Sequence, residues 1–175
     1  YLTARTTQQE AAVSALRLAD VAALRAVVVS AKEKMCVHDF PICREGACPR
    51  AEGYYDRLGG ALDDACQSGG LFTREAIARL AAKYFLCPFE LSLDLATVCD
   101  VIIGDYNYAF DPRVRLQRFF TQRKNPFVLL IDEAHNLPDR ARGMYSAGLS
   151  LQEVTRVRAS VPRKERKSPL YQSLS

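Results

Sequence analysis

Residues 127–135 read Phe-Val-Leu-Leu-Ile-Asp-Glu-Ala-His, five apolar residues followed by two carboxylates and, two positions later, a histidine. An apolar run of this length predicts a strand buried in a parallel sheet. Paired carboxylates at the end of such a strand are typical of Mg²⁺-dependent nucleotide hydrolases, in which one holds the metal and its neighbour orients the attacking water. We therefore predict that Asp132 holds Mg²⁺ and that Glu133 orients the water. The alternative is a strand that runs into a polar turn, with Glu133 and His135 merely solvated.

The composition is that of a globular protein. The chain has 175 residues, of which 49% are hydrophobic, enough for one or two small domains with a buried core. No segment resembles a signal peptide or approaches the roughly 18 apolar residues of a membrane span, so we expect a cytoplasmic protein with no membrane partner. Six cysteines in such a chain favour reduced thiols or metal ligands over disulfides. The net charge of +4 is compatible with a polyanionic partner.

The N-terminal segment predicts two strands and a helix. Residues 1–4 resemble the end of a strand, and Tyr1 is not expected to be a natural start. Thr7-Gln8-Gln9-Glu10 has the spacing of a capping box, and the apolar periodicity after it predicts a helix over much of Thr7 to Leu24. The β-branched run Ala26 to Val29 predicts a buried strand.

The character of the sequence changes between Cys36 and about Cys87, where Gly, Pro and Cys are frequent, and this change predicts an inserted small domain that is mainly helical. The elements expected within the insert and shortly after it are helices at 51–65, at 73–84 with Thr73 as its cap and from Pro88 to about Thr97, then a strand at 101–103. Alternation of strands with helical crossovers predicts an α/β fold with a parallel sheet. Ser150 and Glu153 form a second capping box, which precedes a basic stretch.

Four cysteines form the clearest candidate metal site. Cys36, Cys43, Cys48 and Cys87 are separated by six, four and thirty-eight residues, and the last two are each followed by Pro. Three clustered thiolates and one distant thiolate favour an iron-sulfur cluster. A structural zinc site usually has tighter cysteine pairs on both sides, but zinc stays open as an alternative. Cys66 and Cys99 are interpreted as small buried apolar residues with no metal.

The chain resembles the XPD/DinG family of iron-sulfur DNA helicases, which are superfamily 2 ATP-dependent enzymes. The cysteine spacing is closer to that expected of bacterial members. The resemblance covers most of the chain, in order, and rests on the segments 2–6 (similar to motif Ia), 35–38 and 86–89 around the first and fourth cysteines, 105–112 after the insert, and 129–136 around the Asp-Glu-Ala-His box.

The resemblance implies a RecA-like domain of the P-loop NTPase type that binds Mg²⁺ with ATP, beside an inserted [4Fe-4S] domain. Residues 1–31 and 99–145 would form parts of the RecA-like domain, 32–98 the cluster domain, and 146–175 the start of an arch-like domain. Members of the family move along single-stranded DNA from 5′ to 3′ and open duplex forks. The expected role is therefore DNA unwinding in repair or replication.

Particular residues acquire roles from the resemblance. Asp132 and Glu133 would be the ATPase carboxylates, and His135 would link the nucleotide state to the DNA-contacting parts. The cysteines Cys36, Cys43, Cys48 and Cys87 would hold the cluster.

Six further residues would contact DNA. Arg5 and Thr6 would touch the backbone, Lys32 would lie at the entrance, and Tyr106, Asn107 and Tyr108 would follow the path of the strand. An aromatic ring in that path can stack on an unpaired base.

No G-x-x-x-x-G-K-[ST] motif occurs in the chain, so the loop that cradles the phosphates of ATP is missing from these residues. The ATP site is therefore expected to be incomplete, and the chain to be an internal fragment that needs the remainder of the helicase for ATP turnover and unwinding. Two alternatives remain open. One is an iron-sulfur DNA-binding or redox-sensing module without ATPase activity, and the other is a zinc-stabilised nucleic-acid-binding module.

Overall fold

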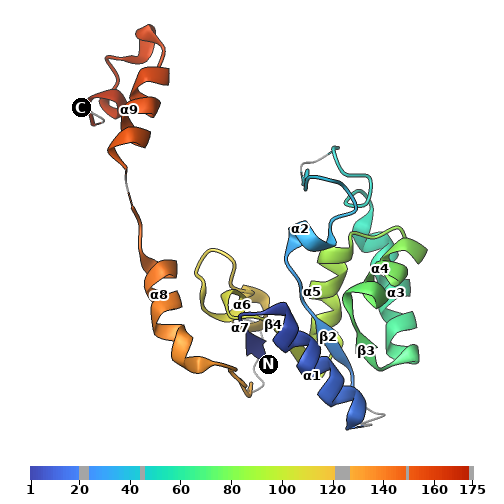
Figure 1. Cartoon of the computed structure of the whole chain (residues 1–175). Helices are drawn as coiled ribbons and strands as arrows, with labels where there is room; N and C mark the ends of the chain where they lie inside the picture. Colours follow the sequence, from blue (N-terminus) through green and yellow to red (C-terminus); the bar gives the residue numbers. More distant parts are fainter. Residues whose placement is uncertain (20–23, 44–45, 121–126, 149, 174–175) are drawn as a thin grey trace.

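The computed structural model describes the chain except for residues 20–23, 44–45, 121–126, 149 and 174–175. Its centre is a sheet of four parallel strands in the order β1-β4-β2-β3 (Figure 1). The strands are β1 (Leu2–Thr3), β2 (Ala26–Val28), β3 (Leu71–Phe72) and β4 (Val101–Asp105). The predicted α/β class with a parallel sheet is confirmed, including the three strands expected near residues 2, 26 and 101.

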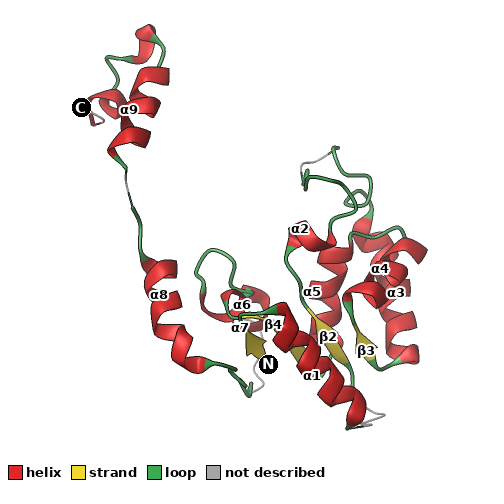
Figure 2. Ribbon diagram, in the orientation of Figure 1, coloured by secondary structure: helices red, strands yellow, loops and turns green. Residues whose placement is uncertain are grey.

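Helices connect and cover these strands, as Figure 2 shows by colour. Helix α1 packs against β1 and β4, and α5 packs against β2. The helices are α1 (Thr6–Leu18), α2 (Lys32–Met35), α3 (Tyr54–Ser68), α4 (Arg74–Lys83), α5 (Pro88–Val98), α6 (Asn107–Phe110), α7 (Gln117–Phe120), α8 (Leu137–Tyr145), α9 (Leu151–Ser160) and α10 (Pro169–Ser173), with single turns η1 (Ala134–Asn136) and η2 (Arg163–Glu165).

Three helix starts follow the local signals. The Thr73 hydroxyl accepts a hydrogen bond from the Ala76 N–H at 3.4 Å, and Ser150 caps α9 in the same way through the Glu153 N–H at 3.1 Å. These two caps confirm the predictions, because each hydroxyl satisfies one of the unpaired amides of a first helical turn. Pro88 begins α5, where its missing N–H leaves no hydrogen bond unmade.

The capping box predicted at Thr7 is wrong. Helix α1 begins one residue earlier, its N-cap is Arg5, and no side chain caps it. The Gln8 side chain does not cap the N-terminus of the helix, because it accepts a hydrogen bond from the Thr3 hydroxyl. The helix also ends at Leu18 rather than near Leu24, and part of the predicted extension, residues 20–23, lies outside the described residues.

The largest difference between prediction and structure concerns the apolar run at residues 127–131. Only Ile131 forms a bridge, parallel to Leu2, and the flanking hydrogen bonds run from the Leu2 N–H to the Leu130 carbonyl (2.8 Å) and from the Asp132 N–H to the Leu2 carbonyl (2.9 Å). The Val128 side chain is 85% exposed, so the predicted buried strand is wrong. The segment lies at the edge of the sheet, where, among the described residues, β1 is its only pairing partner. An apolar pattern predicts burial, but burial also needs a neighbour on each side.

The segment 32–98 shares its hydrophobic core with the sheet. Strand β3 comes from this segment and pairs with β2 in the register Ala26↔Leu71. Val27 and Val29 belong to the same buried cluster as side chains of α3, α4 and α5, which include Ala61, Ile77 and Leu95. The division of the chain at residues 31/32, 98/99 and 145/146 stays a prediction, and at the first two of these points the core is continuous.

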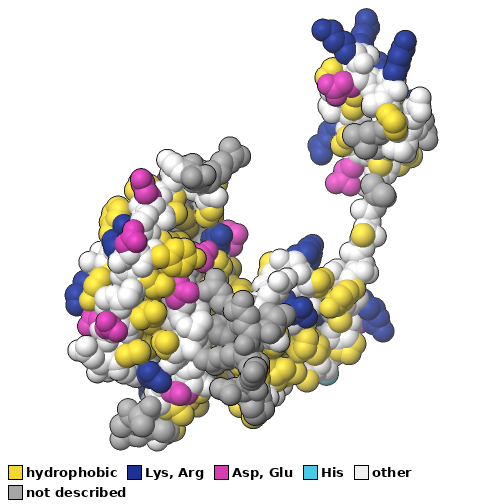
Figure 3. Space-filling view, turned by 180° about the vertical axis from the view of Figure 1, so that it is seen from behind, with side chains coloured by type: hydrophobic (Ala, Val, Ile, Leu, Met, Phe, Trp, Pro, Cys, Tyr) yellow, Lys and Arg dark blue, Asp and Glu magenta, His cyan; other side chains and the backbone are white. Residues whose placement is uncertain are grey.

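Helices α9 and α10 lie apart from the sheet (Figure 1). Helix α8 does contact it, because Leu137 and Met144 pack against the cluster that contains Leu2 of β1. The space-filling view in Figure 3 shows the same separation from the opposite side. The side chains of this end of the chain are therefore open to solvent on most faces.

Candidate functional site

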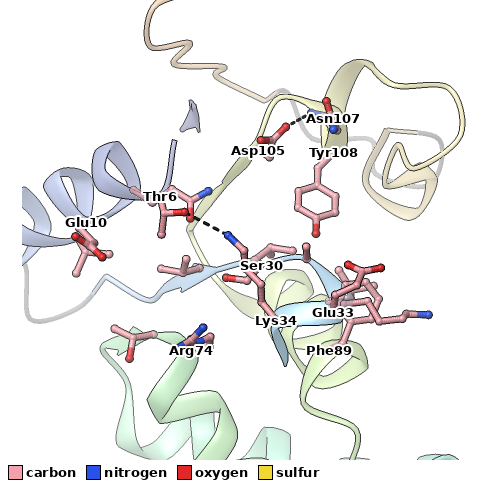
Figure 4. A pocket seen from close by; sticks show the side chains of 18 of the residues that line it. Thr6, Glu10, Ser30, Glu33, Lys34, Arg74, Phe89, Asp105, Asn107 and Tyr108 are labelled. Atoms are coloured by element: carbon pink, nitrogen blue, oxygen red, sulfur yellow. Dashed lines mark hydrogen bonds between the residues drawn. The ribbon is translucent and has the colours of Figure 1, made fainter. Parts of the chain in front are cut away.

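A groove of about 1080 Å³ lies at the carboxyl ends of the parallel strands. Ala4 follows β1, Val28 ends β2, Thr73 follows β3 and Asp105 ends β4, and all four line the groove. Ligands of open α/β sheets bind at this end, because the loops that follow the strands converge there. Figure 4 shows side chains from α1, α2, α4, α5 and the end of β4 facing this space.

Apolar and aromatic side chains contribute to the lining of the groove. Val28, Val29 and Leu93 are among the apolar ones, and the ring of Tyr108 is an aromatic wall (Figure 4). Gly104 makes room for this ring, because a Cβ atom at Gly104 would lie 3.2 Å from Tyr108 Cδ2. The absence of a side chain at Gly104 thus lets the tyrosine ring lie directly against β4.

Burial raises the pKa of Tyr108 to about 12, and the nearby carboxylates of Asp105 and Glu33 act in the same direction. Its phenol therefore stays neutral across the physiological range. A neutral aromatic ring that lies in a groove is suited to stack on a flat heterocycle.

Polar groups also line the groove. The Lys34 Nζ donates to Thr6 Oγ1 at 3.4 Å, which links α2 to the start of α1. The Asn107 N–H donates to Asp105 Oδ1 at 2.9 Å, so the turn after β4 is held by its own side chain. Figure 4 shows both hydrogen bonds. The Lys32 ammonium lies 5.0 Å from the centre of the Phe89 ring.

The charges that line the groove are balanced. Its four cations are Arg17, Lys32, Lys34 and Arg74, and its four carboxylates are Glu10, Glu33, Glu75 and Asp105. Such a surface gives little long-range attraction for a polyanion, since the opposite charges cancel beyond about one Debye length. The groove therefore favours a partner that offers an uncharged flat group.

Four of the six residues predicted to contact DNA line this groove, namely Thr6, Lys32, Asn107 and Tyr108. Arg5 is exposed at the N-cap of α1 but does not line it.

Tyr106 requires a correction. Its side chain is 0% exposed and packs with Leu2 and Ala109, while the Arg140 guanidinium lies 5.2 Å from its ring centre. A buried ring has no free face for a base, so Tyr106 is a core residue.

Several groove residues were not predicted from the sequence. Lys34, Arg74 and Phe89 all line the groove but come from three different helices. Nothing in their local patterns distinguishes them from ordinary surface or core positions. Only the packing of α2, α4 and α5 brings them to one face.

Asp132, Glu133 and His135, the predicted ATPase residues, are not among the residues that line the groove. The Tyr1 hydroxyl donates to Asp132 Oδ2 at 2.7 Å, and burial together with this carboxylate raises the pKa of Tyr1 to about 12. Glu133 has a left-handed backbone with φ of 51°, and its Oε2 lies 3.3 Å from His135 Nδ1. Glu133 and His135 are exposed, so the structure brings these two together at the surface.

The cysteines predicted to hold a cluster are all free thiols. Burial raises the pKa of the Cys87 thiol, and the nearby Cys48 thiol adds to the increase. Cys48 Sγ also lies 3.7 Å from His38 Nε2. Within the described residues no three His, Cys, Asp or Glu side chains are close enough to hold a metal ion. In number and type the four thiols Cys36, Cys43, Cys48 and Cys87 fit a [4Fe-4S] cluster, which stays a prediction.

The other two cysteines differ from one another. Cys99 is buried as predicted, and burial raises the pKa of its thiol to about 12. Cys66 is exposed, so its predicted burial is wrong. Its sulfur lies 3.6 Å from Arg25 Nη1.

Among the described helices, none has the length and hydrophobicity needed to cross a bilayer.

Comparison with known proteins gives related sequences and a similar fold. The chain is 25% identical over 143 residues to a regulator of telomere elongation helicase 1 homolog of Anopheles gambiae, a match that covers 75% of this chain and 14% of that protein. The homolog of Caenorhabditis elegans is 25% identical over 165 residues, a match that covers 86% of this chain and 16% of that protein. This chain thus spans about one seventh of these relatives. They are animal proteins, and the predicted bacterial origin is not confirmed.

A solved structure described as truncated XPD shares the fold. It has a TM-score of 0.58 and 20% sequence identity, and the match covers 99% of this chain and 50% of that one. The sequence profile of the DEAD_2 family matches residues 1–154, which is most of the chain. The chain therefore belongs to the DEAD_2 family.

Proposed function

We propose that this chain is part of an ATP-dependent DNA helicase and holds one unpaired strand in the groove at the carboxyl end of its sheet. The observation that carries the proposal is the convergence of Thr6, Lys32, Asn107 and Tyr108 on one groove. These residues come from α1, α2 and α6, and the resemblance to the XPD/DinG helicases implies a DNA contact for each of them. Membership of the DEAD_2 family and the helicase names of the relatives support the same activity.

The chemical character of the groove favours an unpaired base over a duplex. A base inside a duplex is stacked on both faces, so it cannot reach the ring of Tyr108. An unpaired base can, and stacking is tolerant of sequence because every base has an aromatic face. We propose movement from 5′ to 3′ and a role in repair or replication on the basis of the resemblance to the XPD/DinG helicases.

The ATPase part of the proposal assigns Asp132 to Mg²⁺ with ATP and Glu133 to the attacking water, with His135 beside it. Because the chain has no phosphate-binding loop of the G-x-x-x-x-G-K-[ST] type, we propose that this loop is supplied by another part of the helicase. The four free thiols are proposed to hold a [4Fe-4S] cluster beside the sheet.

The first test is replacement of the groove tyrosine. Tyr108→Ala should weaken binding of a labelled single-stranded oligonucleotide by about 5- to 150-fold, which corresponds to the roughly 1–3 kcal/mol that base stacking contributes. Tyr108→Phe should retain the affinity, because the ring remains. Fluorescence anisotropy with the whole chain measures each affinity.

The matched control is Tyr55→Ala on α3, where the side chain is 81% exposed and lies outside the groove. Its affinity should equal that of the unchanged chain. Equal affinities of the Tyr108→Ala and Tyr55→Ala variants would refute the proposed role of the groove.

A second test uses the close approach at Gly104. Gly104→Ala should displace the Tyr108 ring by a few tenths of an ångström, since the new Cβ would lie 3.2 Å from Cδ2. We expect a loss of about threefold to tenfold in single-strand affinity, equivalent to roughly 0.7–1.4 kcal/mol. The control is Gly59→Ala in α3, where a Cβ meets nothing within 4 Å.

Gly59→Ala should leave binding unchanged and stabilise the chain by about 0.5–1 kcal/mol, because Ala loses less backbone entropy in a helix than Gly. Anisotropy and urea unfolding of both variants distinguish these outcomes. Unchanged affinity in Gly104→Ala would show that the position of the ring does not matter for binding.

A further inference from the structure

The positive charge of the chain is concentrated at its C-terminal end. We call residues 150–173, which contain α9, η2 and α10, the basic module. The module holds six Lys and Arg residues and two Glu, a net charge of +4, and this equals the net charge of the whole chain. Residues 1–149 contain eighteen positive and eighteen negative residues and are therefore neutral. The net positive charge of the chain therefore lies within the module.

The cations of the module are exposed and unneutralised. These six cations are Arg156, Arg158, Arg163, Lys164, Arg166 and Lys167. Their side chains are all exposed, and among the described residues none of them forms an ion pair with a carboxylate. Elsewhere in the chain comparable cations are paired, as in Lys83 with Asp64 at 2.7 Å. Figure 3 shows Lys and Arg side chains projecting from the module into solvent.

An aromatic residue holds two of these cations together. The guanidinium carbons of Arg158 and Arg166 lie 5.5 and 5.9 Å from the centre of the Tyr171 ring. Arg166 Nε also donates to the Val161 carbonyl at 3.3 Å, which fixes this side chain against the turn after α9. Two like charges thus lie near one ring, and within the described part of the chain neither Arg158 nor Arg166 forms an ion pair with a carboxylate. Such an arrangement raises the local positive potential and favours an anion.

We propose that the basic module is a second nucleic-acid site, which binds the phosphate backbone of the strand whose bases the groove holds. The inference rests on the proposed function of the groove but concerns a separate surface. The neutral groove offers an aromatic wall and little net charge, whereas the module offers charge and an Arg-flanked ring. The two surfaces therefore divide base contact and phosphate contact between them.

The test compares two single-stranded probes across a range of salt concentration. One probe is a 15-nucleotide oligo-dT, and the other is an oligonucleotide of the same length built from abasic sites, which keeps the phosphates and lacks the bases. The affinity for each probe is measured for three proteins: the unchanged chain, the Tyr108→Ala variant and a four-substitution variant. The last carries Arg163→Gln, Lys164→Gln, Arg166→Gln and Lys167→Gln. Glutamine is polar and removes the positive charge; at Arg166 it also removes the Nε–H donor to the Val161 carbonyl.

The four-substitution variant should lose binding of the abasic probe. Its slope of log affinity against log salt for oligo-dT should fall in magnitude by about 3, because each phosphate contact with a single strand contributes about 0.7. Tyr108→Ala should weaken oligo-dT binding and leave both the slope and abasic binding unchanged. A double control, Arg79→Gln with Arg115→Gln, removes exposed cations outside the module and should leave the slope unchanged.

Two results would overturn the inference. One is an unchanged slope in the four-substitution variant, and the other is failure of the unchanged chain to bind the abasic probe. Neither result depends on the groove. If the proposal that the groove holds bases is wrong, the Tyr108→Ala variant will instead bind oligo-dT with unchanged affinity.

Discussion

Replacing Leu95 by Ala should lower the free energy of unfolding by about 2–5 kcal/mol, because the substitution removes buried methyl groups and leaves a cavity. The Leu95 side chain is 0% exposed and lies in the cluster that joins α5 to β2 and to the helices α3 and α4. Domains of this size are stable by only about 5–15 kcal/mol. Urea unfolding followed by circular dichroism should show the loss directly.

The matched control is the same substitution at the surface. Leu18 at the end of α1 is 87% exposed, and Leu18→Ala should change stability by no more than about 0.5 kcal/mol. The comparison tests whether segment 32–98 and the sheet share one core. Similar small effects at both positions would show that α5 does not support the sheet.

The second large effect concerns metal content. Purified without oxygen, the unchanged chain should contain about four irons and four sulfides and a visible absorbance band that dithionite bleaches, since four thiolates can hold one [4Fe-4S] cluster. Cys87→Ser should reduce the iron to a small fraction of this value. The band should disappear with it.

The control for this experiment is Cys66→Ser, which changes an exposed thiol outside the predicted ligand set. Its iron content should equal that of the unchanged chain. If the unchanged chain contains one zinc and no iron, the cluster hypothesis is wrong and the zinc-stabilised alternative takes its place. Equal iron in the Cys87→Ser and Cys66→Ser variants would remove Cys87 from the ligand set.

Loss of the cluster should affect a limited region. Val37, Phe40 and Ile42 in the cysteine-containing loop are at least half exposed, so this loop has little core of its own. Helices α3 and α5 are instead tied together by the Tyr54 hydroxyl, which donates to Asp94 Oδ2 at 2.7 Å. Limited proteolysis of Cys87→Ser should therefore cut within residues 36–53 and spare the helices.

Local patterns were sufficient for the elements whose causes are local. The β-branched runs at 26–29 and 101–103 predicted strands because such side chains fit a pleated sheet. Thr73 predicted the start of α4, because its hydroxyl needs only the amide three residues later. The order of strand and crossover predicted a parallel sheet. None of these inferences depends on residues distant in the sequence.

Distant neighbours decided the rest. Tyr106 and Tyr108 both follow β4, and the sequence could not say which ring is available to a ligand. Packing against Leu2 buries the Tyr106 ring. The Tyr108 ring lines the groove, where the missing side chain at Gly104 leaves room for it. The run at 127–131 is as apolar as a core strand but lies at the edge of the sheet, where one side is unpaired within the described residues. The sequence by itself thus determined the parallel sheet, and its resemblance to a helicase family implied four of the residues that line the groove. Only the tertiary structure decided which side chains are exposed, because exposure depends on what the rest of the chain places beside them.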